Sequence, residues 1–87
     1  MLAAYSVSEV SKYIKALIES DDFLQGVWIT GEVSNFTLHS SGHMYFSLKD
    51  ESSRLRCVMF RSQNSHLKFM PQDGMSVFAY GAIGMYE

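Results

Sequence analysis

Two runs of sequence decide the fold of this chain: GEVSNF at residues 31–36 and SSGHMYFSLKD at residues 40–50. In the second run apolar and polar side chains alternate, which predicts a strand with two different faces. The inner face carries the apolar side chains of Met44, Phe46 and Leu48. The outer face carries His43, Tyr45, Ser47 and Lys49. Because aromatic rings stack on bases and cations neutralise phosphates, the outer face has the chemistry of a nucleic-acid-binding surface.

Size and composition indicate one small domain. The chain has 87 residues, of which 47% are hydrophobic, so a single core is affordable and disorder is excluded. Its one cysteine cannot form an internal disulfide, which suits a reducing compartment. We find no secretory signal and no apolar stretch long enough to cross a bilayer. We therefore expect a soluble cytoplasmic protein with no membrane partner.

The charge balance limits how strongly the chain can hold a phosphate backbone. A net charge of −2 argues against a strongly basic grip. The basic side chains nevertheless concentrate in the middle of the chain, at Lys49, Arg54, Arg56, Arg61 and Lys68. This distribution predicts a weak local basic patch on an acidic domain.

One helix and four strands are predicted. Ser6 and Glu9 have the spacing of a capping box, and apolar residues then recur at helical spacing, so we expect a helix over about 6–20. Period-two alternation and turn signals predict strands at about 26–36, 42–50, 54–60 and 75–86. Between the last two strands we expect a short helix or an irregular connection. The predicted core of the middle strands is Met44, Phe46, Leu48, Leu55, Cys57 and Met59.

This order of elements favours a mainly β domain. Short antiparallel strands with tight turns predict a small OB-fold-like Greek-key barrel with an N-terminal α-helix. Such a barrel has five strands, and only four are counted here, so the fifth is expected to be truncated. We interpret residues 1–87 as a single OB-fold-like nucleic-acid-binding domain and as a fragment of a longer protein.

Several motifs, in this order and spacing, resemble one known family. They are YSVSEV at residues 5–10, VWITGEVSNF at 27–36, SGHMYFSLKD at 41–50, RCVMFR at 56–61 and DGM at 73–75. Together they are similar to the N-terminal domain of the large subunit of bacterial exodeoxyribonuclease VII. The resemblance covers nearly all of the chain.

The resemblance implies an OB-fold that binds single-stranded DNA at the front of a larger enzyme. That enzyme, a hydrolase of DNA catabolism, degrades single-stranded DNA from either end into short oligonucleotides in complex with a small subunit. Its nuclease centre belongs to the region after this domain. The resemblance therefore implies a domain that belongs to a nuclease and is itself non-catalytic.

The candidate nucleic-acid-binding residues combine an aromatic platform, basic groups and a polar loop, as OB-folds use for single strands. They are Trp28, Asn35, His39, Ser40, His43, Tyr45, Lys49, Arg56, Phe60 and Arg61. Arg54 lies at the edge of this set. For Trp28 and Phe60 a place in the core is an equal alternative, since large aromatics are mostly buried. Lys49 and Arg56 have the equal alternative of ordinary solvated charges.

No catalytic or metal site is predicted, and no cofactor. His39 and His43 have an H-x3-H spacing, but no cysteine or carboxylate pair stands at ligand spacing beside them. Cys57 lies mid-strand between apolar neighbours, which suits a buried inert thiol.

Two other functions stay open at this stage. The domain is alternatively a subunit-assembly module, whose open strand edge supports a homodimer or strand exchange. The other alternative is an RNA-binding OB domain, because the fold and the stacking chemistry are shared.

Overall fold

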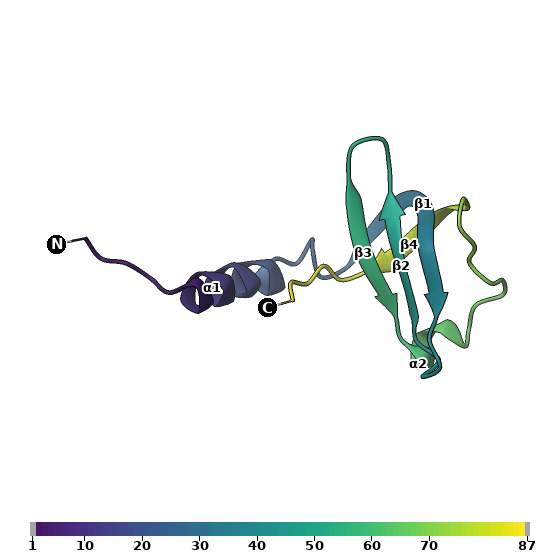
Figure 1. Cartoon of the computed structure of the whole chain (residues 1–87), viewed down its shortest axis with the longest axis horizontal. Coiled ribbons are helices and arrows are strands. Elements are labelled where there is room, and N and C mark those ends of the chain that lie inside the picture. The colour runs from purple at the N-terminus through teal and green to yellow at the C-terminus, as the bar shows by residue number, and fades with distance from the viewer. Residues whose placement is uncertain (1, 87) are drawn as a thin grey trace. The chain divides into compact units, whose positions relative to one another are not determined.

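The computed structural model describes residues 2–86, which form the predicted order of elements (Figure 1). The elements are α1 (Val7–Ser20), β1 (Val27–Leu38), β2 (Met44–Lys49), β3 (Arg54–Met59), α2 (Arg61–Asn64) and β4 (Ser76–Gly81). No helix among these residues is long and apolar enough to span a membrane.

The last strand is shorter than predicted. We expected it to continue to about residue 86, but β4 ends at Gly81. Beyond it, the backbone N–H of Ile83 donates to the carbonyl of Leu24 at 2.7 Å, so the chain bonds to a turn rather than extending the strand.

The four strands form one open sheet in the order β3-β2-β1-β4. Three consecutive strands with the fourth returning beside the first is the Greek-key order. The mainly β fold with an N-terminal helix is therefore confirmed.

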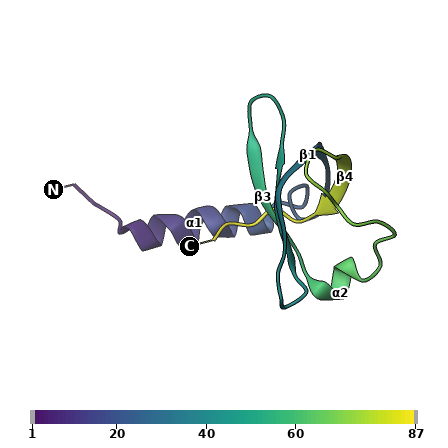
Figure 2. The ribbon, with the colours of Figure 1, turned by 45° about the vertical axis from the view of Figure 1, so that its right-hand side comes forward.

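The chain divides into two compact units, and the division falls inside β1 and inside β4. One unit comprises Met1–Ile29 and Ala79–Glu87, and the other comprises Thr30–Phe78. The second unit contains the β2–β3 hairpin, which Figure 1 shows beside β1. Figure 2 shows the segment between α2 and β4 arching outward from these strands.

A break in β1 organises the larger unit. β1 pairs with β2 from Glu32 to Ser34, the register then shifts, and pairing resumes at Thr37. Asn35 within the break has φ of 53°, a left-handed conformation that asparagine tolerates better than most residues. The backbone N–H of Phe36, released from the ladder, donates to Asp73 Oδ1 at 2.9 Å. The break is thus held by a side chain from the turn before β4.

The same turn bonds directly to β1. The N–H of Val33 donates to the carbonyl of Met75, and the N–H of Gly74 donates to the carbonyl of Val33, each at 2.8 Å. Gly74 has φ of 92°, which glycine adopts without a steric penalty. The predicted turn at Asp73 and Gly74 therefore fixes both the break and the path of β4.

The core of this unit lies under the inner face of β2. Met44 and Leu48 are 5% and 4% exposed, and Val33 on β1 is 1% exposed. The predicted alternation of β2 is confirmed at these positions. The prediction for Leu55 is wrong: it is 42% exposed, because β3 is an edge strand with no neighbour on its outer side.

α1 begins as predicted, since Ser6 is the N-cap and its Oγ accepts the N–H of Glu9 at 3.0 Å. At the other end of the helix, Gln25 Nε2 donates to the carbonyls of Ile18 and Ile83, both at 3.1 Å. This side chain ties the helix end to the segment after β4 within the smaller unit.

Leu48→Ala should lower the free energy of unfolding by about 2–5 kcal/mol, because it removes a buried side chain and leaves a cavity. Leu55→Ala is the matched control, since Leu55 is the cross-strand partner of Leu48 and is much more exposed. Its expected cost is about 1 kcal/mol or less. Urea unfolding of both variants measures this, and equal losses would contradict the assigned core.

Candidate nucleic-acid interface

The outer face of the β1–β2–β3 sheet is built from rows of cross-strand partners, whose side chains share one face of a sheet. The central row is Ser34 on β1, Ser47 on β2 and Arg56 on β3. The flanking rows are Glu32–Lys49–Arg54 and Thr37–Tyr45–Val58. The face is therefore polar over three strands, as the alternation of β2 predicted.

A hollow of about 280 Å³ lies on this face. Its lining residues are Asn35, Thr37, Tyr45, Phe46, Ser47, Arg54 and Arg56. Three of them, Asn35, Tyr45 and Arg56, are candidates from the sequence. Sequence reasoning placed Arg54 only at the edge and omitted Thr37 and Ser47 from the candidates. Arg54, Thr37 and Ser47 are brought together by the cross-strand register, which the sequence alone does not specify.

Arg54 and Arg56 give the hollow its charge. Both are exposed, and within residues 2–86 neither forms an ion pair. Two residues apart on one strand, they project from the same face. Two like charges this close repel each other and attract an anion, and the planar fork of arginine suits phosphate oxygens.

Lys49 lies on the outer face, but its charge is paired there. Its Nζ lies 3.5 Å from Glu32 Oε2, on the neighbouring strand. This ion pair offsets the charge of Lys49, so the arginines carry the positive potential of the face.

Two hydroxyl groups form the floor of the central row. Ser47 was expected to face solvent, but it is 6% exposed because it lies on the middle strand between Ser34 and Arg56. The Oγ of Ser34 is fully buried and has no hydrogen-bond partner. Buried polar groups are almost always paired, so an orphaned hydroxyl beside a hollow is an unusual feature.

The loop between β1 and β2 brings an aromatic group to the hollow. His39 and Tyr45 meet edge to face, with ring centroids 6.2 Å apart at 83°. The His39 ring is oriented by the loop, since its Nδ1 accepts the N–H of Ser41 at 3.0 Å. Ser40, another candidate, is exposed at the loop tip. The loop therefore places His39, but not His43, beside Tyr45.

His43, Phe60 and Arg61 form a separate cluster that fixes the start of α2. His43 Nδ1 accepts the backbone N–H of Arg61 at 2.9 Å, and its ring packs edge to face on Phe60 with centroids 5.4 Å apart. The side chain of Asn64 adds a bond of 2.7 Å to the carbonyl of Gly42. These contacts give His43 a structural role in joining the loop to α2.

Trp28 belongs to the smaller unit and is 68% exposed, so it is not a core residue. Its ring centroid lies 5.2 Å from that of Tyr80, with 58° between the planes. Tyr80 was not among the sequence candidates.

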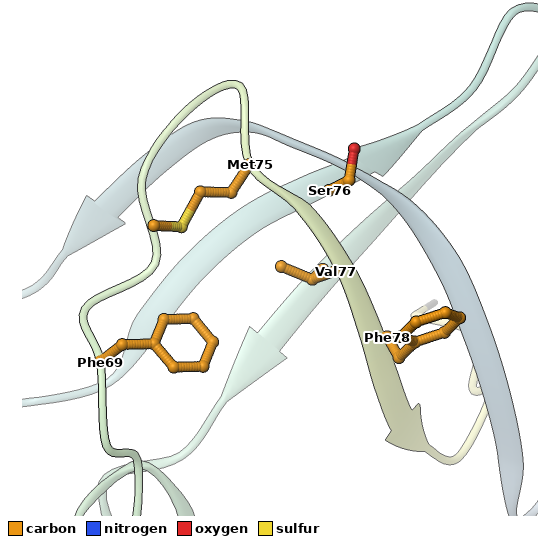
Figure 3. A pocket seen from close by; sticks show the side chains of 5 residues that line it. All are labelled: Phe69, Met75, Ser76, Val77 and Phe78. Atoms are coloured by element: carbon orange, nitrogen blue, oxygen red, sulfur yellow. The ribbon is translucent and has the colours of Figure 1, made fainter.

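A larger hollow of about 450 Å³ has a different character (Figure 3). Phe69, Met75 and Val77 converge on it from the connecting segment and from the start of β4. Ser76 points to the opposite side. Because its lining carries no cation, this hollow does not suit a phosphate backbone.

The described residues contain no cluster of three or more histidine, cysteine or acidic side chains that could hold a metal ion. Burial raises the pKa of the Cys57 thiol. The backbone N–H groups of Ser52 and Ser53 lower the pKa of Asp50 by bonding to its carboxylate in the β2–β3 turn. Both shifts belong to the structure of the hairpin rather than to a reaction.

Comparison with known proteins shows the family of the chain. Residues 5–87 match the family model described as "OB-fold nucleic acid binding domain". The chain belongs to this family.

Curated relatives of the domain share one name. The exodeoxyribonuclease 7 large subunit of Brevibacillus brevis is 52% identical over 82 residues, which are 94% of this chain and 18% of the relative. That of Alkaliphilus oremlandii is 49% identical over 86 residues, 99% of this chain and 21% of the relative. That of Natranaerobius thermophilus is 54% identical over 82 residues, which are 94% of this chain and 19% of the relative. The OB domain thus spans about a fifth of these relatives, and the resemblance noted from its motifs is confirmed.

Cys57 in the folded OB domain should react with iodoacetamide more slowly than a cysteine in an unstructured peptide. Its raised pKa reduces the thiolate fraction at pH 8, and only the thiolate is nucleophilic. The rate should rise at higher pH than for the peptide, and unfolding in urea should abolish the difference. Equal rates without urea would contradict the buried environment.

Proposed function

We propose that this OB domain binds single-stranded DNA on the outer face of β2 and β3, as the N-terminal domain of an exodeoxyribonuclease VII large subunit. The observation that carries the proposal is the hollow in which Tyr45, two arginines without ion pairs among the described residues and the nearly buried Ser47 meet. This combination occurs on a domain of a nucleic-acid-binding family.

Each group has a distinct part in binding. Arg54 and Arg56 hold phosphate oxygens, which position the strand without reading its sequence. Tyr45, 40% exposed, offers a ring face on which a base stacks. Asn35 and Ser47 line the hollow, where they can bond to base edges or sugar.

The domain's contribution to the whole protein follows from this chemistry. The relatives' name supports a parent protein that is the large subunit of an exodeoxyribonuclease. We infer that this enzyme hydrolyses single-stranded DNA in the bacterial cytoplasm, together with a small subunit. The OB domain, which lacks a metal cluster among its described residues, holds the strand while a centre elsewhere in the protein cleaves it.

Tyr45→Ala should weaken binding of fluorescein-labelled oligo-dT by about 1–3 kcal/mol, the contribution of one stacked base. Arg56→Ala should weaken it too and should flatten the salt dependence, whose slope is about −0.7 per neutralised phosphate. Lys68→Ala removes an exposed charge outside the hollow and should change little. Fluorescence anisotropy at several salt concentrations measures all four proteins.

The same titration contains the outcomes that oppose the proposal. If the domain fails to bind oligo-dT even at low salt, DNA binding by this chain is wrong. If Lys68→Ala and Arg56→Ala weaken binding equally, attraction is diffuse and the hollow is not the site. A matched RNA oligonucleotide that binds more tightly than the DNA would favour the RNA-binding alternative.

A second candidate function, subunit assembly, is favoured by one observation on α1. Val7, Val10, Ile14 and Leu17 repeat at three- and four-residue spacing, as at the contact positions of paired helices, and all are more than 40% exposed. A homodimer formed by pairing of two α1 helices would cover them.

Light scattering distinguishes assembly from DNA binding. The assembly role requires a dimer that dissociates in an Ile14→Lys variant, whether or not DNA is present. If the protein stays strictly monomeric at a concentration 100-fold above its dissociation constant for DNA, the assembly role is contradicted.

A further inference from the structure

An exposed aromatic pair stands in the smaller unit, apart from the residues of the hollow. Trp28 and Tyr80 are 68% and 62% exposed, although large aromatic side chains are mostly buried. Their rings are in contact but tilted by 58°, so they do not cover each other face to face. Most of both ring surfaces therefore remains open to solvent.

The strands hold this pair outward. On β1, Trp28 alternates with the less exposed Val27 and Ile29, and on β4, Tyr80 follows the less exposed Ala79. The two rings thus project from the outward positions of neighbouring strands.

A glycine makes room for the second ring. Any Cβ at Gly26 would collide with the hydroxyl of Tyr80. A residue with a side chain at this position would therefore have to shift the hydroxyl end of Tyr80.

We propose that Trp28 and Tyr80 form a second base-stacking platform for single-stranded nucleic acid. The inference rests on the proposed function and extends it to a part of the domain that lies outside the hollow. Stacking requires only an accessible ring face, because every base has a π-face of its own. Trp28 and Tyr80, both more than 60% exposed, supply such faces.

The amount of surface favours a base over a protein partner. Two aromatic side chains bury about 150–250 Å² each, whereas a specific protein interface buries roughly 1,000 Å² or more. A single base is of the right size for such a platform, and the family to which the domain belongs binds nucleic acid.

The test uses Trp28, the only tryptophan of the chain, as the reporter. Unlabelled oligo-dT should quench the fluorescence of the 87-residue chain as it binds. Tyr80→Ala should weaken binding by about 5- to 150-fold, the range that corresponds to one stacked base. Tyr80→Phe keeps the ring and should bind almost as the wild type does.

Matched variants separate stacking from general effects. Tyr86→Ala removes a tyrosine that is 90% exposed and has no aromatic neighbour among residues 2–86, so binding should not change. Gly26→Ala leaves both rings in the sequence but shifts the hydroxyl end of Tyr80, so it should weaken binding less than Tyr80→Ala does. Circular dichroism of each variant shows whether the fold is retained.

An oligonucleotide with abasic positions tests stacking directly, because it lacks bases to stack. A purely structural role of Tyr80 would not change the preference for oligo-dT over this oligonucleotide. The wild type should bind it more weakly than oligo-dT of equal length, and this preference should shrink in Tyr80→Ala. An undiminished preference, or unchanged Trp28 fluorescence on binding, would overturn the platform while leaving binding in the hollow intact. Failure of the wild type to bind any oligonucleotide would overturn both proposals.

Discussion

The register of the three-stranded β1–β2–β3 face is the constraint on which the rest of the structure depends. Ser47 lies opposite Ser34 on one side and opposite Arg56 on the other, so one face collects polar side chains while Met44 and Leu48 fill the core. A slip of one residue would exchange these faces and expose the core of β2. The break at Asn35, bonded through Phe36 to Asp73, confines the change in register to one place.

Function follows from what that register leaves unsatisfied. Arg54 and Arg56 project from the same face without ion pairs among the described residues, and this repulsion would be relieved by a phosphate bound as we propose. The Lys49–Glu32 pair shows the contrasting case, a cation on the same face that is already neutralised. If DNA binds in the hollow as we propose, a small area of positive charge is enough to hold it on a chain of net charge −2.

Periodicity and turn chemistry predicted most of the fold, because they act locally. The Ser6 cap, the alternation of β2 and the turn at Gly74 are all present as expected. The exposure of a side chain depends on neighbouring strands, so it was harder to predict from the sequence. The exposure of Leu55 follows from the edge position of β3, and the burial of Ser47 follows from its partners on both sides. Among the site residues, Tyr80 was missed because its contact with Trp28 joins segments distant in the sequence.

The most direct test of the central claim is a map of backbone amide chemical shifts while oligo-dT is added to the isotopically labelled domain. If DNA binds on the outer face, the largest changes fall on β2 and β3 around Tyr45, Ser47 and Arg56, with small changes around the apolar hollow at Phe69. Changes concentrated at Phe69 and Met75, with Ser47 unaffected, would contradict it.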